Sequence, residues 1–151
     1  MAEERLGRTL GITAKLVREH FDLTLRAVGS SFPAYLLLRH ASQSPGVSQR
    51  QLADKLGIEA PTLVRHIDRL AGDGLVERVP HVRDRRVSHV RLTAAGRAHL
   101  ERIEVVAAEM NAELAGLFAP SELAALTRYL NRIWEAYTRD TKEGDDSRRV
   151  G

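Results

Sequence analysis

Residues 48–92 read SQRQLADKLGIEAPTLVRHIDRLAGDGLVERVPHVRDRRVSHVRL, and this stretch predicts the fold of the chain. Ser48 is a favourable helix N-cap, and Gln51 stands three residues later as its partner in a capping box. Gly57 suits the end of that short helix, because glycine readily adopts the left-handed conformation of a C-cap. Pro61 suits the first turn of a second helix. Two short helices joined by a tight turn predict a helix-turn-helix.

The two predicted helices have an apolar side and a polar side. The residues expected to face inward are Leu52, Ala53, Leu56, Ile58, Leu63, Val64, Ile67 and Leu70. The second helix then presents hydrogen-bonding and cationic side chains outward, namely Thr62, Arg65, His66 and Arg69. Such side chains suit the base edges and phosphates of DNA. The alternative interpretation is an ordinary solvated helix surface, on which Arg69 could pair with Asp73.

A β-hairpin is predicted directly after the helix-turn-helix. Residues 75–79 and 87–92 are rich in β-branched side chains, which favour strands. The intervening loop, residues 80–86, is short enough to join two antiparallel strands. The predicted fold class is therefore mainly α, a winged helix-turn-helix with one small β-hairpin as its wing.

The tip of the predicted wing carries three arginines, Arg83, Arg85 and Arg86. An arginine-rich loop fits the narrow minor groove of DNA, where the negative potential is strongest. In isolation, the same loop would be interpreted as a solvated charged turn; its place after a helix-turn-helix favours contact with DNA. Asp84 would be repelled by phosphates, so we expect it to orient the wing through a salt bridge with Arg86 or Arg78.

Helical periodicity on both sides of this centre predicts further helices over 5–28, 33–43, 93 onward and 121–140. We expect one domain over 1–151, a winged helix-turn-helix lobe over 33–92, and dimerisation helices over 1–28 and 93–140. The polar residues 141–151 are expected to form a frayed, flexible tail.

The last predicted helix carries apolar residues at alternating steps of three and four, namely Leu123, Leu126, Leu130, Ile133 and Tyr137. This spacing resembles a coiled-coil seam and favours a partner helix. We therefore expect a homodimer, whose two recognition helices would lie about 34 Å apart in successive major grooves. We interpret Tyr129, Trp134 and Tyr137 as core or interface residues and not as part of a cofactor site.

The composition excludes several functional classes. The 151 residues include no cysteine, which rules out disulfides, thiolate zinc sites and cysteine nucleophiles. No apolar run approaches the ~20 residues that span a bilayer, and the N-terminus lacks the pattern of a secretory signal, so we expect a cytoplasmic protein. The net charge is +3. Ten Arg and Lys against six Asp and Glu lie within residues 48–97, so the excess positive charge is central.

No catalytic motif stands out, and we expect neither an enzyme nor a cofactor. The sequence lacks a Ser-His-Asp or Cys-His pattern, a glycine-rich phosphate loop and paired catalytic carboxylates. The six histidines show no i, i+4 pairing and no nearby carboxylate cluster, so we predict no metal site.

The motifs of this stretch resemble the MarR family, with SlyA-like regulators as the nearest branch. The resemblance is carried by Ile58–Arg65, Gly74–Arg78, Asp84-Arg85-Arg86 and Leu92-Thr93-Ala94-Ala95-Gly96. It implies an obligate homodimer, intertwined through its first, fifth and sixth helices, on a pseudo-palindromic operator of double-stranded DNA.

The resemblance also implies roles for individual residues. Pro61, Thr62 and Arg65 would touch base edges, Arg85 would enter the minor groove, and Ser48 and Gln49 would lie near backbone phosphates. Two features depart from the family pattern: Ala71-Gly72 replaces a bulkier, acidic pair, and Ala60 is a poor N-cap for the recognition helix.

Family members often bind small aromatic carboxylates between the dimer base and the DNA-binding lobe. The residues that could line such a cleft here are Lys15, Arg18, His20, Tyr35, Arg39 and His40; each could equally be ordinary helix surface. The leading hypothesis is a transcriptional regulator, more a repressor than an activator, released from DNA by such a ligand. The alternative is a winged-helix scaffold that binds another protein and not DNA.

Overall fold

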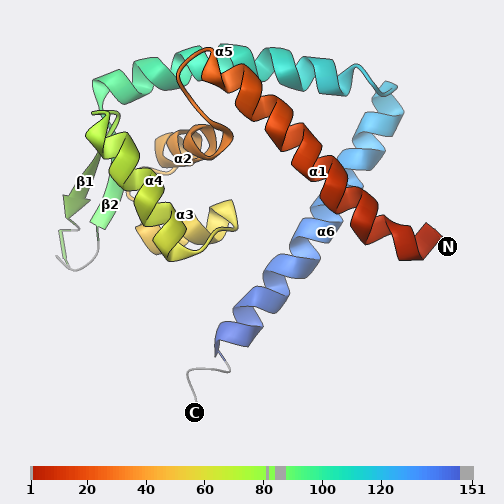
Figure 1. The fold of residues 1–151 in the computed structure, drawn as a ribbon. Helices are drawn as coiled ribbons and strands as arrows, with labels where there is room; N and C mark the ends of the chain where they lie inside the picture. Colours follow the sequence, from red (N-terminus) through yellow and green to blue (C-terminus); the bar gives the residue numbers. More distant parts are fainter. Residues whose placement is uncertain (1, 81, 84–87, 147–151) are drawn as a thin grey trace. The chain divides into compact units, whose positions relative to one another are not determined.

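The computed structural model describes residues 2–80, 82–83 and 88–146 (Figure 1). Its elements, in order, are α1 (Ala2–Arg26), α2 (Phe32–Gln43), α3 (Gln49–Leu56), α4 (Ala60–Gly72), β1 (Val76–Pro80), β2 (Ser88–Leu92), α5 (Ala94–Ala115) and α6 (Pro120–Asp146). The predicted fold class is confirmed: the chain is mostly helical with a two-stranded antiparallel hairpin. It forms two compact units, Met1–Glu109 and Met110–Gly151.

Local signals set the ends of the short helices. The Ser48 hydroxyl accepts a hydrogen bond from the Gln51 backbone N–H at 3.2 Å, and the Gln51 side chain accepts one from the Ser48 N–H at 3.0 Å. The predicted capping box of α3 is thus confirmed. Gly57 closes α3 with φ of 63°, a left-handed conformation in which any L side chain would be strained.

Two details of α4 differ from the prediction. Its N-cap is Glu59, not Ala60, and the Glu59 side chain makes no capping hydrogen bond. Val64, predicted to face inward, is 39% exposed. The buried stripe of α4 consists of Leu63, Ile67 and Leu70. Because successive helical residues are rotated by about 100°, Val64 is turned away from the side that Leu63 buries.

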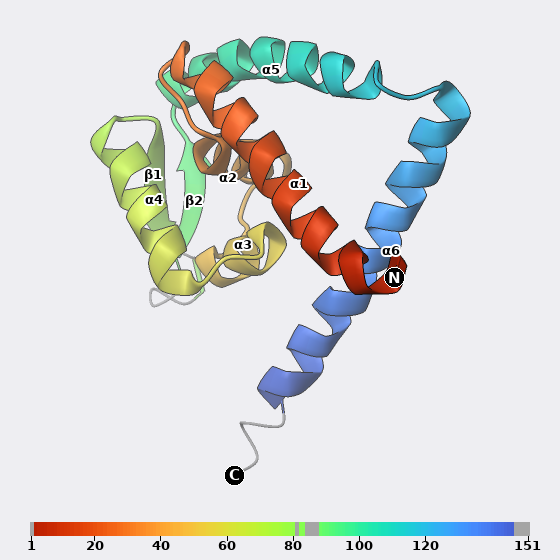
Figure 2. The same ribbon diagram turned by 45° about the vertical axis from the view of Figure 1, so that its right-hand side comes forward.

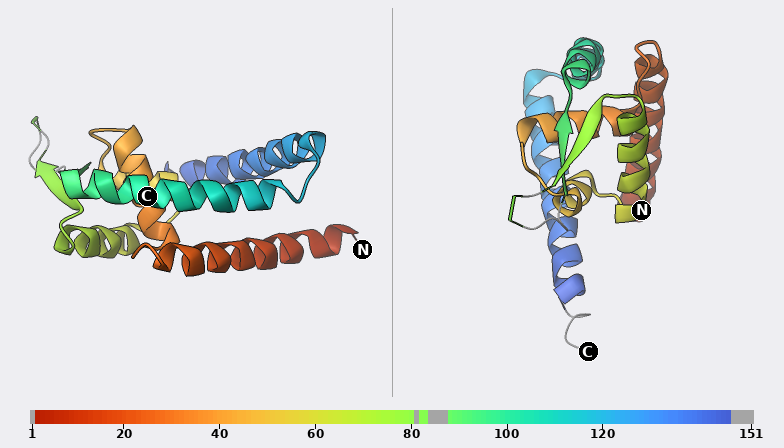
Figure 3. Two further views of the ribbon diagram at one scale, coloured as in Figure 1. Left: turned by 90° about the horizontal axis from the view of Figure 1, so that it is seen from above. Right: turned by 90° about the vertical axis from the view of Figure 1, so that its left-hand side faces the viewer.

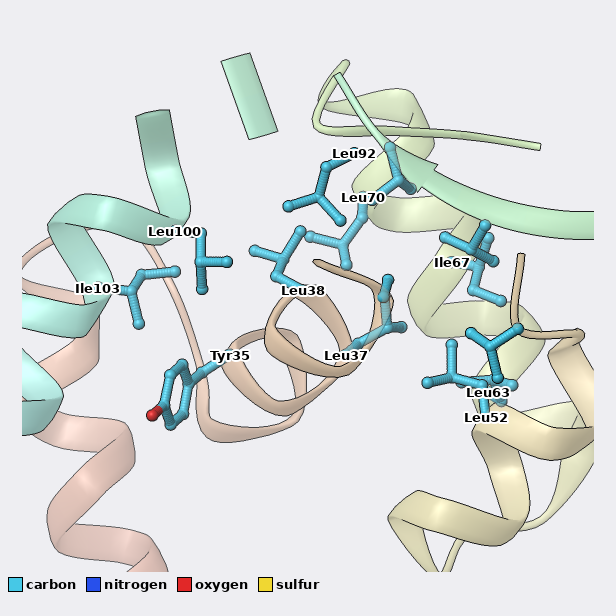
Figure 4. Close-up of a cluster of buried hydrophobic side chains, with 14 of the residues drawn as sticks. Tyr35, Leu37, Leu38, Leu52, Leu63, Ile67, Leu70, Leu92, Leu100 and Ile103 are labelled. Atoms are coloured by element: carbon cyan, nitrogen blue, oxygen red, sulfur yellow. The ribbon is translucent and has the colours of Figure 1, made fainter. Parts of the chain in front are cut away.

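The core of the first unit joins α2 to the helix-turn-helix and to α5. In Figure 4, Leu37 lies toward Leu52, Leu63 and Ile67, and all four side chains are at most 1% exposed. The other labelled residues continue the cluster toward α5, namely Tyr35, Leu38, Leu70, Leu92, Leu100 and Ile103. This cluster supports α4 from behind and leaves the opposite side of the helix to solvent.

The hairpin pairs in a regular register from Val76 opposite Leu92 to Pro80 opposite Ser88. Its base is attached to α5 by Thr93, whose hydroxyl donates to the Gly74 carbonyl at 2.7 Å and accepts from the Gly96 N–H at 3.0 Å. A Cβ at Gly96 would lie 1.9 Å from the Leu75 carbonyl oxygen. The Leu-Thr-x-x-Gly motif is therefore the joint between wing and helix.

The helices at the two ends of the chain expose much of their apolar surface. On α1, Leu6, Ile12, Leu16 and Leu23 are between 49% and 63% exposed, while Phe21 and Leu25 are buried. On α6 the exposed large apolar residues are Tyr129, Leu130, Trp134 and Tyr137. Within the described residues, no helix combines the length and apolar character needed to cross a membrane.

The C-terminal end of α6 corrects one expectation. We predicted a frayed tail from residue 141, but the helix continues to Asp146. Lys142 and Glu143 are good helix formers, so polar composition alone does not end a helix that is already nucleated. The last five residues of the predicted tail, 147–151, lie outside the described part of the chain.

Candidate nucleic-acid interface

The outward face of α4 carries most of the predicted base-contacting residues. Pro61, Arg65 and Arg69 are exposed, whereas Thr62 and His66 are half-buried at the margin of this face. The Arg65 guanidinium donates to the Thr62 hydroxyl at 3.3 Å, which holds the arginine along the first turns of the helix. The face also contains an anion, Asp68, which is exposed.

The hairpin lies alongside α4 in Figures 1 and 3 (right). At its tip, Val82 and Arg83 are exposed. The three other predicted wing residues, Asp84, Arg85 and Arg86, lie outside the described residues. The predicted cationic wing is thus represented by Arg83 alone within the described part of the tip.

The start of α3 is attached to the wing. Ser48 forms an isolated antiparallel bridge with His89 of β2, and the Gln49 amide donates to the Ser88 hydroxyl at 2.7 Å. Both predicted phosphate-contacting residues are therefore half-buried and bonded within the protein. Because both side chains already make hydrogen bonds within the protein, a phosphate could be bound here only by the backbone and the remaining polar atoms.

Two ion pairs that the sequence did not single out involve the wing. The Arg78 guanidinium of β1 donates to the Asp68 carboxylate of α4 at 2.6 Å. Across the hairpin, Arg91 donates to Glu77 at 2.8 Å. Arg78, one of the two predicted partners of Asp84, is thus paired with α4. The Glu77–Arg91 pair could have been predicted from the sequence by aligning the two strands of the hairpin, in which these residues lie opposite each other. The Asp68–Arg78 pair could not, because it depends on how the hairpin lies against α4.

The candidate ligand residues separate into two groups. On α2, the Arg39 guanidinium donates to the hydroxyl of buried Tyr35 at 2.7 Å and lies 3.9 Å from the Glu104 carboxylate of α5. Burial, helped by the nearby cations Lys55 and Arg39, lowers the pKa of His40 below its ordinary value.

The other group consists of Lys15, Arg18 and His20, which are exposed. All three belong to α1, the helix at the N-terminal end of the ribbon in Figure 2. The Lys15 ammonium pairs with Glu19 of the same helix at 3.6 Å. The structure therefore joins Tyr35 and Arg39 on α2, with Glu104 added from α5. It sets His40 of α2 near Lys55 and leaves Lys15 engaged within α1. Among the described residues, no group of three or more His, Asp or Glu side chains is arranged to hold a metal ion.

Comparison with known proteins places this arrangement in a family. The MarR family model matches residues 31–88, which run from the N-cap of α2 to the start of β2. The transcriptional repressor CouR, solved bound to a 23-mer DNA duplex, is 31% identical over 87% of this chain and 93% of its own, with a TM-score of 0.81.

Two further solved structures are similar over most of their length. A mutant MarR from E. coli, complexed with operator DNA, is 25% identical over 85% of this chain and 92% of its own, with a TM-score of 0.79. PcaV from Streptomyces coelicolor, in complex with its natural ligand, is 26% identical over 84% of this chain and 92% of its own, with a TM-score of 0.75. The shared fold, the matching winged helix-turn-helix and the 31% identical repressor together show that this chain belongs to the MarR family.

Proposed function

We propose that the protein is a transcriptional regulator that binds double-stranded DNA sequence-specifically through α4 and the wing. The observation that carries the proposal is the exposed, cationic face of α4 beside an arginine-bearing hairpin, on the fold of a 31% identical repressor solved with DNA. The protein would act by binding and not by catalysis.

In the proposed complex, α4 enters the major groove. Its N-terminal residues Pro61, Thr62 and Arg65 meet base edges, since recognition helices use their first turns for this contact. Arginine binds guanine O6 and N7 through two hydrogen bonds, and the Arg65–Thr62 contact directs the guanidinium to the same end of α4. His66 and Arg69 would contact the margins of the groove, where phosphates lie.

The wing is proposed to enter the adjacent minor groove. Arg83, Arg85 and Arg86 would supply the cations, with Asp84 fixing the loop. The start of α3 would meet a phosphate with the backbone N–H of Gln49 and the hydroxyl proton of Ser48, since the Ser48 N–H already donates to Gln51 and the positive end of the helix dipole attracts anions.

We further propose a homodimer on a pseudo-palindromic operator. The support is the exposed apolar surface of α1 and α6, which a partner chain could bury. Residues 1–28 and 93–140 would form the dimer base and residues 33–92 the DNA-binding lobe of one MarR-type domain. A two-fold axis would then present two α4 helices to one side of the duplex.

Repression and ligand release are the final parts of the proposal. PcaV was solved with its natural ligand, and CouR from Rhodococcus jostii RHA1, which is 22% identical to this chain, was solved with p-coumaroyl-CoA. By analogy, a small aromatic or anionic effector would bind near Tyr35, Arg39 and His40, with Lys15, Arg18 and His20 at the rim, and release a repressed promoter. We also propose that the protein is located in the cytoplasm and belongs to the SlyA-like branch of the family.

The test is DNA binding by wild type and by Arg65→Ala, measured against the DNA upstream of the protein's own gene and against a random duplex. We expect Arg65→Ala to weaken specific binding by about 1–3 kcal/mol. Arg26→Ala, which removes the same charge from the last turn of α1, is the matched control. Equal DNA affinity for wild type and Arg65→Ala would refute the role of α4. A folded dimer that binds no DNA at low salt would favour the protein-binding scaffold.

A further inference from the structure

The Asp68–Arg78 ion pair is the feature that the proposed DNA contacts leave unexplained. Asp68 is an exposed carboxylate on the outward face of α4, three residues after Arg65 and one before Arg69. A carboxylate there would be repelled by the phosphates that the neighbouring arginines attract. Its partner is not a neighbour on α4 but Arg78 of β1, at 2.6 Å.

Within the described residues, the pair and one hydrogen bond link side chains of the hairpin to the helix-turn-helix. Arg78 holds β1 to α4, and the Gln49–Ser88 hydrogen bond of 2.7 Å holds β2 to the start of α3. The Glu77–Arg91 pair, in contrast, lies within the hairpin and joins its two strands. The first two links, unlike the third, join the hairpin to another element and can therefore affect the angle between the wing and the helix-turn-helix.

Stability does not explain the pair. The Asp68 side chain is 58% exposed and that of Arg78 is 34% exposed, and exposed ion pairs contribute little to folding. A link of this kind can still restrict how the hairpin tilts, because it joins the exposed outer edge of α4 to the strand that leads to the wing tip. If α4 and the wing are already held at one angle, they lose less conformational entropy when both bind the same DNA, so the affinity is higher.

We propose that Asp68 and Arg78 are positioning residues, which hold the wing at the angle to α4 that lets both contact one stretch of DNA. This inference rests on the proposed function and assigns a role to an acidic residue on its DNA-facing side. The pair sets geometry; the two residues need not touch the nucleic acid themselves.

The sign of one substitution tests the proposal. Asp68→Asn removes a negative charge near DNA, so electrostatics alone predicts tighter binding. A positioning role predicts weaker binding, by about three- to fivefold for an exposed ion pair. Asp68→Glu, which keeps the charge, should restore most of the lost affinity. Unchanged or tighter binding by Asp68→Asn would overturn the proposal.

Matched controls come from the pair within the hairpin. Glu77→Gln removes the same charge as Asp68→Asn, and we expect DNA affinity equal to or above that of wild type. Arg78→Gln should weaken binding more than Arg91→Gln does, although each removes one positive charge from a wing strand. Equal losses for the two arginine variants would mean that charge, and not position, is what matters. All variants should unfold within a few degrees of wild type.

A DNA-free measurement separates this inference from the proposed function. The chain has no cysteine, so Gly72→Cys on α4 and Val82→Cys on the wing can be spin-labelled specifically in protein diluted with unlabelled chain. A Cβ at Gly72 meets nothing within 4 Å, and Val82 is fully exposed. We expect the interspin distance distribution to broaden with Asp68→Asn and not with Glu77→Gln. Identical widths would refute the positioning role, whether or not wild type binds DNA.

Discussion

Gly96 leaves no room for a side chain. Any side chain there would bring its Cβ to 1.9 Å from the Leu75 carbonyl oxygen, an atom of the backbone that cannot rotate away. We predict that Gly96→Ala lowers the free energy of unfolding by about 1–3 kcal/mol, as overpacking does. Gly72→Ala is the control: its Cβ would meet nothing within 4 Å, so helix propensity should raise stability by about 0.5–1 kcal/mol. Chemical denaturation of both variants measures the difference, and equal stabilities would contradict the close approach.

Buried His99 predicts that the stability of the fold depends on pH. The imidazole is buried, and its Nδ1 lies 3.1 Å from the Arg102 guanidinium, so Nδ1 must be unprotonated to accept that hydrogen bond. Burial and then Arg102 lower the pKa of His99, which the Asp73 carboxylate partly opposes. The unfolded chain therefore binds protons more readily than the folded protein as the pH falls below about 6.5. Stability contributed by the neutral ring is fully present above that pH and is lost as the pH falls below it.

The corresponding prediction concerns the slope of stability with pH. The Tm of wild type should fall between pH 7.5 and 5.5, and His99→Gln should reduce that fall while still accepting a hydrogen bond from Arg102. The fall should not vanish, because the pKa of His40 is lowered as well. His20→Gln, which removes an exposed imidazole on α1, is the comparison. If Tm in His99→Gln depends on pH as steeply as in wild type, the buried histidine is not responsible.

At the scale of the elements, the capping box at the start of α3 connects local sequence to the proposed interface. Ser48 ends the loop after α2, caps α3 and bridges to β2. We predict that Ser48→Ala lowers the free energy of unfolding by about 1 kcal/mol and also weakens DNA binding, because the first turn of α3 would fray. Ser31→Ala, which removes the longer 3.4 Å cap of α2, should reduce stability without a specific effect on DNA. If both variants lose DNA affinity in the same proportion to their loss of unfolding free energy, Ser48 has no specific role in DNA binding.

The elements themselves could be predicted from the sequence because their signals are local. The capping box at Ser48, the glycine at 57 and the β-branched strands act through neighbours in the chain. Val64 was predicted on the wrong side because hydrophobicity does not reveal how wide the buried stripe of α4 is. Glu59 was missed as N-cap because its side chain caps nothing.

The candidate site could be predicted only in part. The outward residues of α4 followed from helical periodicity, and Arg65 and Arg69 are exposed in agreement with it. The Asp68–Arg78 pair could not be predicted, because its residues lie on different elements and meet only through the angle of the hairpin. The same holds for Arg39, whose contact with Glu104 joins α2 to α5.

At the scale of the whole molecule, the exposed apolar surfaces require an explanation. Leu130, Trp134 and Tyr137 recur at helical spacing on α6 and are 44%, 53% and 73% exposed. We predict that Leu130→Glu weakens self-association at least tenfold, because a buried, unpaired carboxylate opposes dimer formation. Arg132→Glu, a larger change of charge two positions along α6, should have less effect. Sedimentation equilibrium measures both; a wild-type monomer at micromolar concentration would contradict the proposed dimer.

The most direct measurement of the central claim is the affinity of the protein for genomic DNA as a function of salt. Footprinting first locates the preferred site, and fluorescence anisotropy then compares that site with a random duplex from 50 to 200 mM salt. We predict that log Kobs falls linearly with log salt concentration for both duplexes, that the preferred site binds at least about 10³-fold more tightly, and that Arg65→Ala removes most of this preference. Equal affinity for both duplexes, or a preference unchanged by Arg65→Ala, would contradict recognition of DNA by α4.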